Sequence, residues 1–76
     1  MIKTTIKLTS IGDVQKFVNA VARFSGDVDL SSGRYVVDAK SIMGIFSLDL
    51  MQPVEMTIHS DNADQLLSDV AEYIVK

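Results

Sequence analysis

The sequence is poor in the residue types that most often build covalent or catalytic chemistry. It has no cysteine, which excludes disulfides, thiol nucleophiles and zinc sites built on thiolates. It has one histidine, His59, and one proline, Pro53. No apolar run approaches the roughly 20 residues of a membrane span, and residues 1–5 lack the continuous apolar core of a signal peptide. We therefore expect a cytoplasmic protein that does not enter a membrane.

Clusters of positive charge are also missing. The chain has seven basic and ten acidic residues, for a net charge of −3. The basic residues are scattered along the chain at Lys3, Lys7, Lys16, Arg23, Arg34, Lys40 and Lys76. Phosphate contacts need clustered lysine and arginine, so we expect no nucleic-acid partner. The 76 residues are 47% hydrophobic and 22% charged, which is typical of a globular chain. We expect one domain over residues 1–76.

Hydrophobic patterning predicts the element order β-α-β-β-α-β-α. Alternating apolar and polar residues predict strands at 2–8, 27–31, 34–38 and 53–58, with a tight turn at Ser32-Gly33. Helical spacing predicts helices over 11–24, 42–48 and 63–74. The stripe expected to face the core in the first helix is Ile11, Val14, Phe17, Val18, Val21 and Phe24. One antiparallel sheet covered by helices on one face buries every stripe, but a ferredoxin-like sheet has nearly the same order of elements.

Serine precedes two of the predicted helices. Ser10, with Asp13 three residues later, has the spacing of a capping box. Ser41 stands where the N-cap of the second helix is expected, close to backbone N–H groups that lack partners. Such a place suits a cap, and it also suits a phosphate. The third helix is expected to follow a loop, residues 59–62, that ends in a cap.

The residues after Ser41 are too apolar for a short exposed helix without a partner. We expect Ile45 to face the sheet, and at least two of the other three, Ile42, Met43 and Phe46, to be exposed. The run from Lys40 to Leu48 closely resembles the regulatory-serine segment of HPr, the small phosphocarrier protein of the bacterial sugar phosphotransferase system. Weaker resemblance extends through residues 15–19 and the hairpin at Gly33.

The resemblance implies both a fold and a regulatory site. The implied fold is α+β: an open-faced two-layer sandwich with a four-stranded antiparallel sheet of order 1-4-2-3 and three helices on one face. Ser41 is then the serine that HPr kinase phosphorylates. The phosphoserine form is expected to bind a transcriptional regulator of carbon catabolite repression or another protein of the phosphotransferase system. Lys40, Ile42, Met43 and Phe46 would contact that partner.

The family's carrier histidine is missing from the place where the resemblance puts it. In the family, a histidine at the start of the first helix accepts a phosphoryl group from enzyme I, and an arginine and a proline follow it. Aligning residues 17–18 without a gap puts Ser10, Gly12 and Asp13 at these three positions. A serine without a base is a poor nucleophile, and Asp13 would repel phosphate. We interpret Ser10 and Asp13 as caps and expect no phosphate from enzyme I.

The remaining polar residues point to no enzyme site. His59 is expected to be solvated, because no arginine is close to it in the sequence. The acidic residues Asp27, Asp29, Asp61, Asp64, Asp69 and Glu72 are expected to be solvated surface and not metal ligands or acid–base groups. We expect no metal, no cofactor and no catalytic activity.

The leading hypothesis is thus a regulatory HPr-like binding module that is switched at Ser41 and has no carrier activity. One alternative is a phosphocarrier with a hidden acceptor or with Ser10 as acceptor. Acid lability is the discriminating observation, because phosphohistidine is acid-labile and phosphoserine survives acid. The other is a structural or oligomerising module in which residues 2–6, at a sheet edge, pair with a second copy. We expect a monomer or a weak homodimer.

Overall fold

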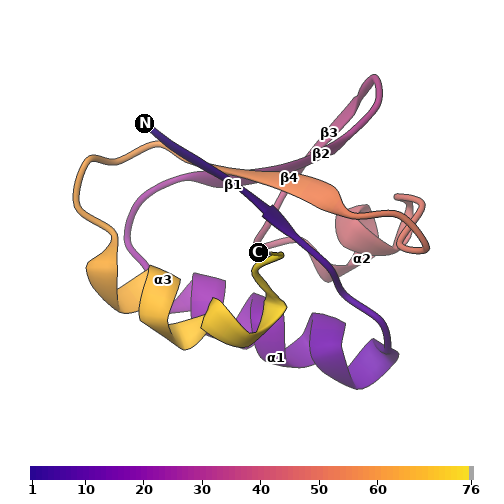
Figure 1. Ribbon diagram of the computed structural model, residues 1–76, viewed down its shortest axis with the longest axis horizontal. Coiled ribbons are helices and arrows are strands. Elements are labelled where there is room, and N and C mark those ends of the chain that lie inside the picture. The colour runs from indigo at the N-terminus through magenta and orange to yellow at the C-terminus, as the bar shows by residue number, and fades with distance from the viewer. Residues whose placement is uncertain (76) are drawn as a thin grey trace.

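The computed structural model describes residues 1–75. Its elements follow the predicted order, with one 3-10 turn added at the end. They are β1 (Ile2–Ile6), α1 (Ile11–Ala22), β2 (Val28–Ser32), β3 (Tyr35–Asp38), α2 (Ile42–Phe46), β4 (Val54–Ile58), α3 (Asp64–Asp69) and η1 (Ala71–Tyr73) (Figure 1). No helix within residues 1–75 is long and apolar enough to cross a membrane.

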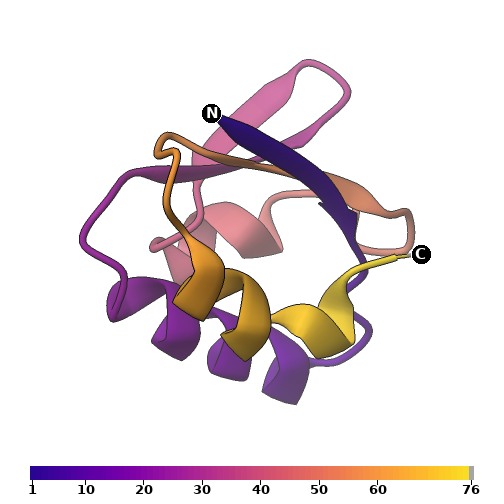
Figure 2. The same ribbon diagram turned by 60° about the vertical axis from the view of Figure 1, so that its left-hand side comes forward.

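The four strands form one antiparallel sheet in the order β1-β4-β2-β3. This confirms the order 1-4-2-3. The three helices lie on the same side of the sheet, and its other face is open (Figure 2). The hairpin of β2 and β3 reaches beyond the helical layer (Figure 2). Its two-residue turn is Gly33-Arg34 and not Ser32-Gly33, because Ser32 pairs with Tyr35 and Gly33 takes a φ of 58°, which glycine adopts without steric cost.

The core fills the space between the sheet and the helices. The strands contribute the side chains that alternate inward, and Val54, Met56 and Ile58 in β4 are all buried, as predicted. From α1, Phe17 and Val21 are fully covered. No polar or charged side chain is buried within residues 1–75, so apolar burial holds the layers together at about 1.5–3 kcal/mol for each large side chain.

The expected apolar stripe of α1 is wrong at one residue. Ile11 is 66% exposed, although its spacing matches that of the buried Val14 and Phe17. It is the first residue of α1 and borders a hollow that is open to solvent. Ile11 is therefore a surface residue, which bears on the site described below.

The C-terminal helix is shorter than predicted. The sequence pattern extends to residue 74, but α3 ends at Asp69 and η1 follows. The chain then turns extended: Lys7 donates its N–H to the carbonyl of Tyr73 at 2.8 Å, and Val75 donates to the carbonyl of Thr5 at 2.9 Å. These bonds pair the second half of the outer edge of β1, which a continued helix would leave unpaired.

Two further details of this end of the chain differ from or extend the prediction. The N-cap of α3 is Ala63, whose methyl side chain cannot cap a helix, so the cap expected at the end of this loop is missing. Within the loop, Asn62 donates its N–H to the hydroxyl of Ser60 at 3.1 Å. In η1, the ring of Tyr73 meets Phe17 edge to face, with centroids 6.2 Å apart. Burial raises the pKa of Tyr73 to about 12.

Candidate functional site

Ser41 is the N-cap of α2, as predicted. Its backbone is extended, with φ −100° and ψ 105°, and its hydroxyl accepts the N–H of Gly44 at 3.1 Å. The turn before it is held by Asp38, whose carboxylate accepts the N–H of Lys40 at 2.8 Å and whose carbonyl accepts the N–H of Ser41 at 3.0 Å. The Ser41 side chain is exposed. The hydroxyl is therefore fixed in position and open to solvent.

Close packing behind Ser41 accounts for the glycine at position 44. A Cβ atom added there would lie 3.2 Å from the Ser41 hydroxyl oxygen and 3.2 Å from the Cβ of Val37. Both distances are tighter than ordinary van der Waals contact. Gly44 thus lets α2 approach β3 closely while its N–H bonds the serine.

The side chains of α2 divide between core and solvent. Ile45 is fully buried, and Ile42 is partly buried against the core. Met43 is 76% exposed and Phe46 is 41% exposed. The prediction that at least two of the three apolar residues beside Ser41 would be exposed is confirmed, as is the inward position of Ile45. Short as it is, α2 presents apolar side chains next to an exposed serine.

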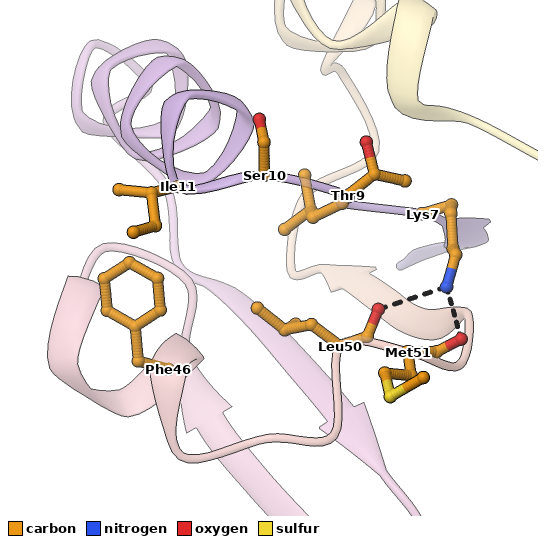
Figure 3. Close-up of a pocket in the computed structure, with 8 residues that line it drawn as sticks. Lys7, Thr9, Ser10, Ile11, Phe46, Leu50 and Met51 are labelled. Carbon is orange, nitrogen blue, oxygen red and sulfur yellow. Dashed lines mark hydrogen bonds between the residues drawn. The ribbon is translucent and has the colours of Figure 1, made fainter.

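Phe46 also borders a hollow of about 460 Å³ between α2, the start of α1 and the loop before β4. Ile11 faces Phe46 across it, and Leu50 and Met51 form its lower side (Figure 3). Lys7 closes one end, because its ammonium group donates to the carbonyls of Leu50, at 3.1 Å, and Met51. The lining is mostly apolar and open to solvent.

Three of these lining residues are not among the site residues predicted from the sequence. The spacing of Ile11 predicts a core position, and Leu50 and Met51 lie in the loop between α2 and β4. Met51 is 84% exposed. The available signal was the pair of adjacent apolar residues in a loop: Leu50 is partly buried against the core, which leaves Met51 exposed.

The N-terminus of α1 is built in a different way. Ser10 accepts the N–H of Asp13 at 3.0 Å, which confirms the predicted cap. The Asp13 carboxylate does not return to the N–H of Ser10, as a capping box requires; it accepts the N–H of Thr9 at 3.2 Å and the hydroxyl of Thr9 at 2.8 Å. The bond from the Thr9 hydroxyl is the main cause that lowers the pKa of Asp13. A carboxylate therefore occupies this helix start.

His59 is not the isolated, solvated residue that we expected, and Asp29 is not simply solvated either. The Nε2 atom of His59 lies 2.7 Å from an Asp29 carboxylate oxygen, and both side chains are 38% exposed. The pairing follows from the sheet register: Asp29 is opposite Thr57, and His59 is two residues further along on the same open face. The expected order 1-4-2-3 makes β2 and β4 neighbours, but it does not give their register, and the register is what brings His59 to Asp29.

This pair is far from Ser10. His59 follows the end of β4 that pairs with Ile2, whereas Ser10 follows the end of β1 that pairs with Val54. The two residues thus lie beyond opposite ends of the sheet.

The acids of the last helical region also form no metal site: no group of three or more possible ligands occurs within residues 1–75. Asp69 accepts a bond from Gln65 at 2.9 Å, and Asp61 pairs with the amino group of Met1 at 2.9 Å, which lowers the pKa of Asp61.

Comparisons with known proteins agree with this architecture. Residues 13–76 match the family described as "PTS HPr component phosphorylation site". The crystal structure of HPr-C-His from Thermoanaerobacter tengcongensis is similar with a TM-score of 0.79 at 25% identity, over 95% of this chain and 89% of that one. A phosphocarrier protein HPr from Bacillus anthracis str. Ames is similar with a TM-score of 0.74 at 24% identity, over 97% and 96% of the two chains. The family match includes Ser41 and begins after Ser10.

Proposed function

Since this chain belongs to the HPr component family of the phosphotransferase system, we propose that it acts there as a regulatory binding module, switched by phosphorylation of Ser41 and without a carrier histidine. The supporting observation is the combination at α2. An exposed serine hydroxyl stands at the helix start, and two exposed apolar side chains, Met43 and Phe46, lie on the same short helix. A partner protein could contact a phosphate on Ser41 and these apolar side chains at the same time.

The electrostatics of α2 favour a phosphate at Ser41. Residues 42–44 carry no acidic side chain, and the first N–H groups of a helix attract negative charge. A phosphoserine adds a charge of about −1.5 to −2, which at an exposed helix start stabilises by about 0.3–1 kcal/mol. Its oxygens would leave acceptor sites for an arginine or lysine of a partner.

The start of α1 is unsuited to carrier chemistry. A phosphoacceptor serine needs a base to activate it. The hydroxyl of Ser10 accepts the backbone N–H of Asp13, and the carboxylate of Asp13 is hydrogen-bonded to Thr9 and not to Ser10. An incoming phosphoryl group would meet that negative charge. The only histidine of the sequence, His59, lies beyond the opposite end of the sheet. These features argue against transfer from enzyme I.

The partners that we propose are those of the regulatory branch of this system. An HPr kinase would modify Ser41, and a regulator of carbon catabolite repression or another phosphotransferase-system protein would bind the product. Lys40, Ile42, Met43 and Phe46 are the proposed contact residues. Met43 and Phe46 would supply the desolvated apolar contact, because phosphate attraction alone is screened by salt. We propose no cofactor and no catalytic step carried out by this chain.

The proposal is tested by phosphorylation with defined donors and intact-mass measurement. ATP and HPr kinase should add one acid-stable phosphate, and Ser41→Ala should abolish it. Ser47→Ala is the matched control, since Ser47 ends the same helix and its hydroxyl donates to the carbonyl of Gly44 at 2.6 Å; it should leave the modification intact. Phosphoenolpyruvate with enzyme I should add nothing. An acid-labile phosphate from that donor, or modification with Ser41 untouched, would contradict the proposal.

A further inference from the structure

The two edges of the sheet differ in how they are protected. The second half of β1 is covered by the chain itself, since Tyr73 and Val75 make strand-like bonds to Lys7 and Thr5. The other edge is β3, in the hairpin that reaches beyond the helical layer (Figure 2). There, Tyr35 is 73% exposed and Val36 is 65% exposed. An uncovered edge strand with apolar side chains is a template for pairing with another strand.

The backbone groups that face this open edge are those of Val36 and Asp38. Ala39 donates its N–H to the carbonyl of Val28 at 2.9 Å, so in the alternating ladder Tyr35 and Val37 also bond β2. The N–H and C=O of Val36 then point away from the sheet, and within residues 1–75 they have no partner. The carbonyl of Asp38 is used internally by the N–H of Ser41. Val36 is thus the centre of the free edge.

The side chains around Val36 have opposite charges on its two sides. Val36 is opposite Ser31, and Asp38 is opposite Asp29, so both lie on the open face of the sheet. Arg34 lies in the turn, two residues before Val36 and just outside β3. Arg34 has no ion-pair partner within residues 1–75, and the Asp38 carboxylate bonds only a backbone N–H there.

This arrangement is complementary to itself. If two copies of β3 run antiparallel about a two-fold axis through Val36, the two Val36 residues exchange N–H···O=C bonds, and Arg34 of each copy is opposite Asp38 of the other. The pair of Arg34 and Asp38 then occurs twice, while Val36 meets its own counterpart. We propose that this chain self-associates through β3 in that register, to give one sheet continuous across two copies.

The contact does not depend on Ser41 phosphorylation and would stand if the proposed function failed. It is also small: one short strand on each side lies well below the area of a stable interface, about 1,200–2,000 Å². We therefore expect a transient dimer whose fraction rises with concentration. The occupant is a second copy and not an unrelated peptide, because both halves of the charge pattern, Arg34 in the turn and Asp38 in β3, are present in the same hairpin.

Sedimentation velocity over about 10 μM to 1 mM tests for the dimer. Charge reversal tests the register. Arg34→Asp and Asp38→Arg alone should each weaken association by about tenfold or more, because each places like charges opposite each other at both ends of the contact. The double variant should restore it. An equimolar mixture of the two single variants should form heterodimers, since every facing pair is again opposite in sign. Lys3→Asp, a reversal at the other edge, should change nothing.

A second variant guards against misfolding at Asp38, whose carboxylate closes the turn before Ser41. Val36→Pro removes the outward N–H without touching a bond to β2, which edge strands tolerate, and it should leave a folded monomer by circular dichroism. A wild-type protein that stays monomeric throughout the range would overturn the proposal. So would a dimer that survives Val36→Pro, a double reversal that fails to restore association, or a dimer lost with Lys3→Asp.

Discussion

The starts of α1 and α2 share a serine N-cap and differ in the residues around it. In both, a serine outside the helix accepts the N–H of the residue three positions on, at 3.0 Å for Ser10 and 3.1 Å for Ser41. At α1 that residue is Asp13, whose carboxylate is held by Thr9. At α2 it is Gly44, which has no side chain to fill the space. A serine cap by itself therefore says little about function.

What separates the two sites is charge and exposure. Negative charge already occupies the start of α1, while residues 42–44 bring none to the start of α2. Beside Ser41, Met43 and Phe46 are exposed on the same helix. The two sites are not remote from each other, because Ile11 and Phe46 line the same hollow (Figure 3). The apolar surface beside Ser41 therefore continues to the start of α1.

The largest expected effect comes from removing the inward anchor of α2. Ile45→Ala deletes a fully buried side chain and should lower the free energy of unfolding by about 2–5 kcal/mol. Met43→Ala, on the exposed side of the same helix, should change it by less than about 0.5 kcal/mol. Urea denaturation with unchanged m-values checks both. Equal losses for the two variants would mean that α2 does not divide into an inner and an outer side.

The next effect concerns binding. Met43→Ala should weaken binding of the Ser41-phosphorylated form to its regulator by about 1–2 kcal/mol, as loss of an apolar anchor does. Met51→Ala is the matched control: it removes another exposed methionine, on the far side of the hollow, and should have a smaller effect. Titration calorimetry measures both. A larger loss for Met51→Ala would move the contact away from α2.

A smaller effect tests the charge difference between the two helix starts directly. Ser41→Asp keeps a good capping residue and adds negative charge, so it should raise the free energy of unfolding by about 0.3–1 kcal/mol. Ser10→Asp should raise the free energy of unfolding by less, because the new carboxylate lies beside that of Asp13. Thermal unfolding at low and high salt checks the pair, and the difference should shrink with salt. Equal gains at both positions would remove the electrostatic distinction.

The smallest effect is the pH dependence contributed by Asp13. Its pKa in the folded protein is lowered, chiefly by the bond from the Thr9 hydroxyl, relative to about 3.9 for an unfolded aspartate. It therefore contributes stability above about pH 4 that is lost as the pH falls through the folded pKa. Asp13→Asn should remove this loss, and Thr9→Val should reduce it. Unfolding curves between about pH 2 and 7 measure it, and an unchanged acid profile in both variants would contradict it.

Most of the architecture could be predicted because it depends on periodicity. Alternation in Val54, Met56 and Ile58 placed a strand with one buried face, and the serine caps marked the starts of α1 and α2. The strand order itself came from the resemblance of the Ser41 segment, since periodicity left a ferredoxin-like sheet open. Local patterns predicted the ends of two helices incorrectly. Ile11 has the spacing of a core residue but is exposed at the start of α1. The last helix ends early because residues 73–75 bond the edge of β1 instead.

The sequence by itself determined the order of the elements, the two caps and the apolar residues beside Ser41, because these depend on side chains close together along the chain. Only the tertiary structure decided which distant residues meet. It paired His59 with Asp29 through the register of β2 and β4, and brought Ile11 to Phe46. It also covered one sheet edge with residues 73–75 and left β3 open. Long-range pairing is set by the burial of the whole core at once, and no local pattern encodes it.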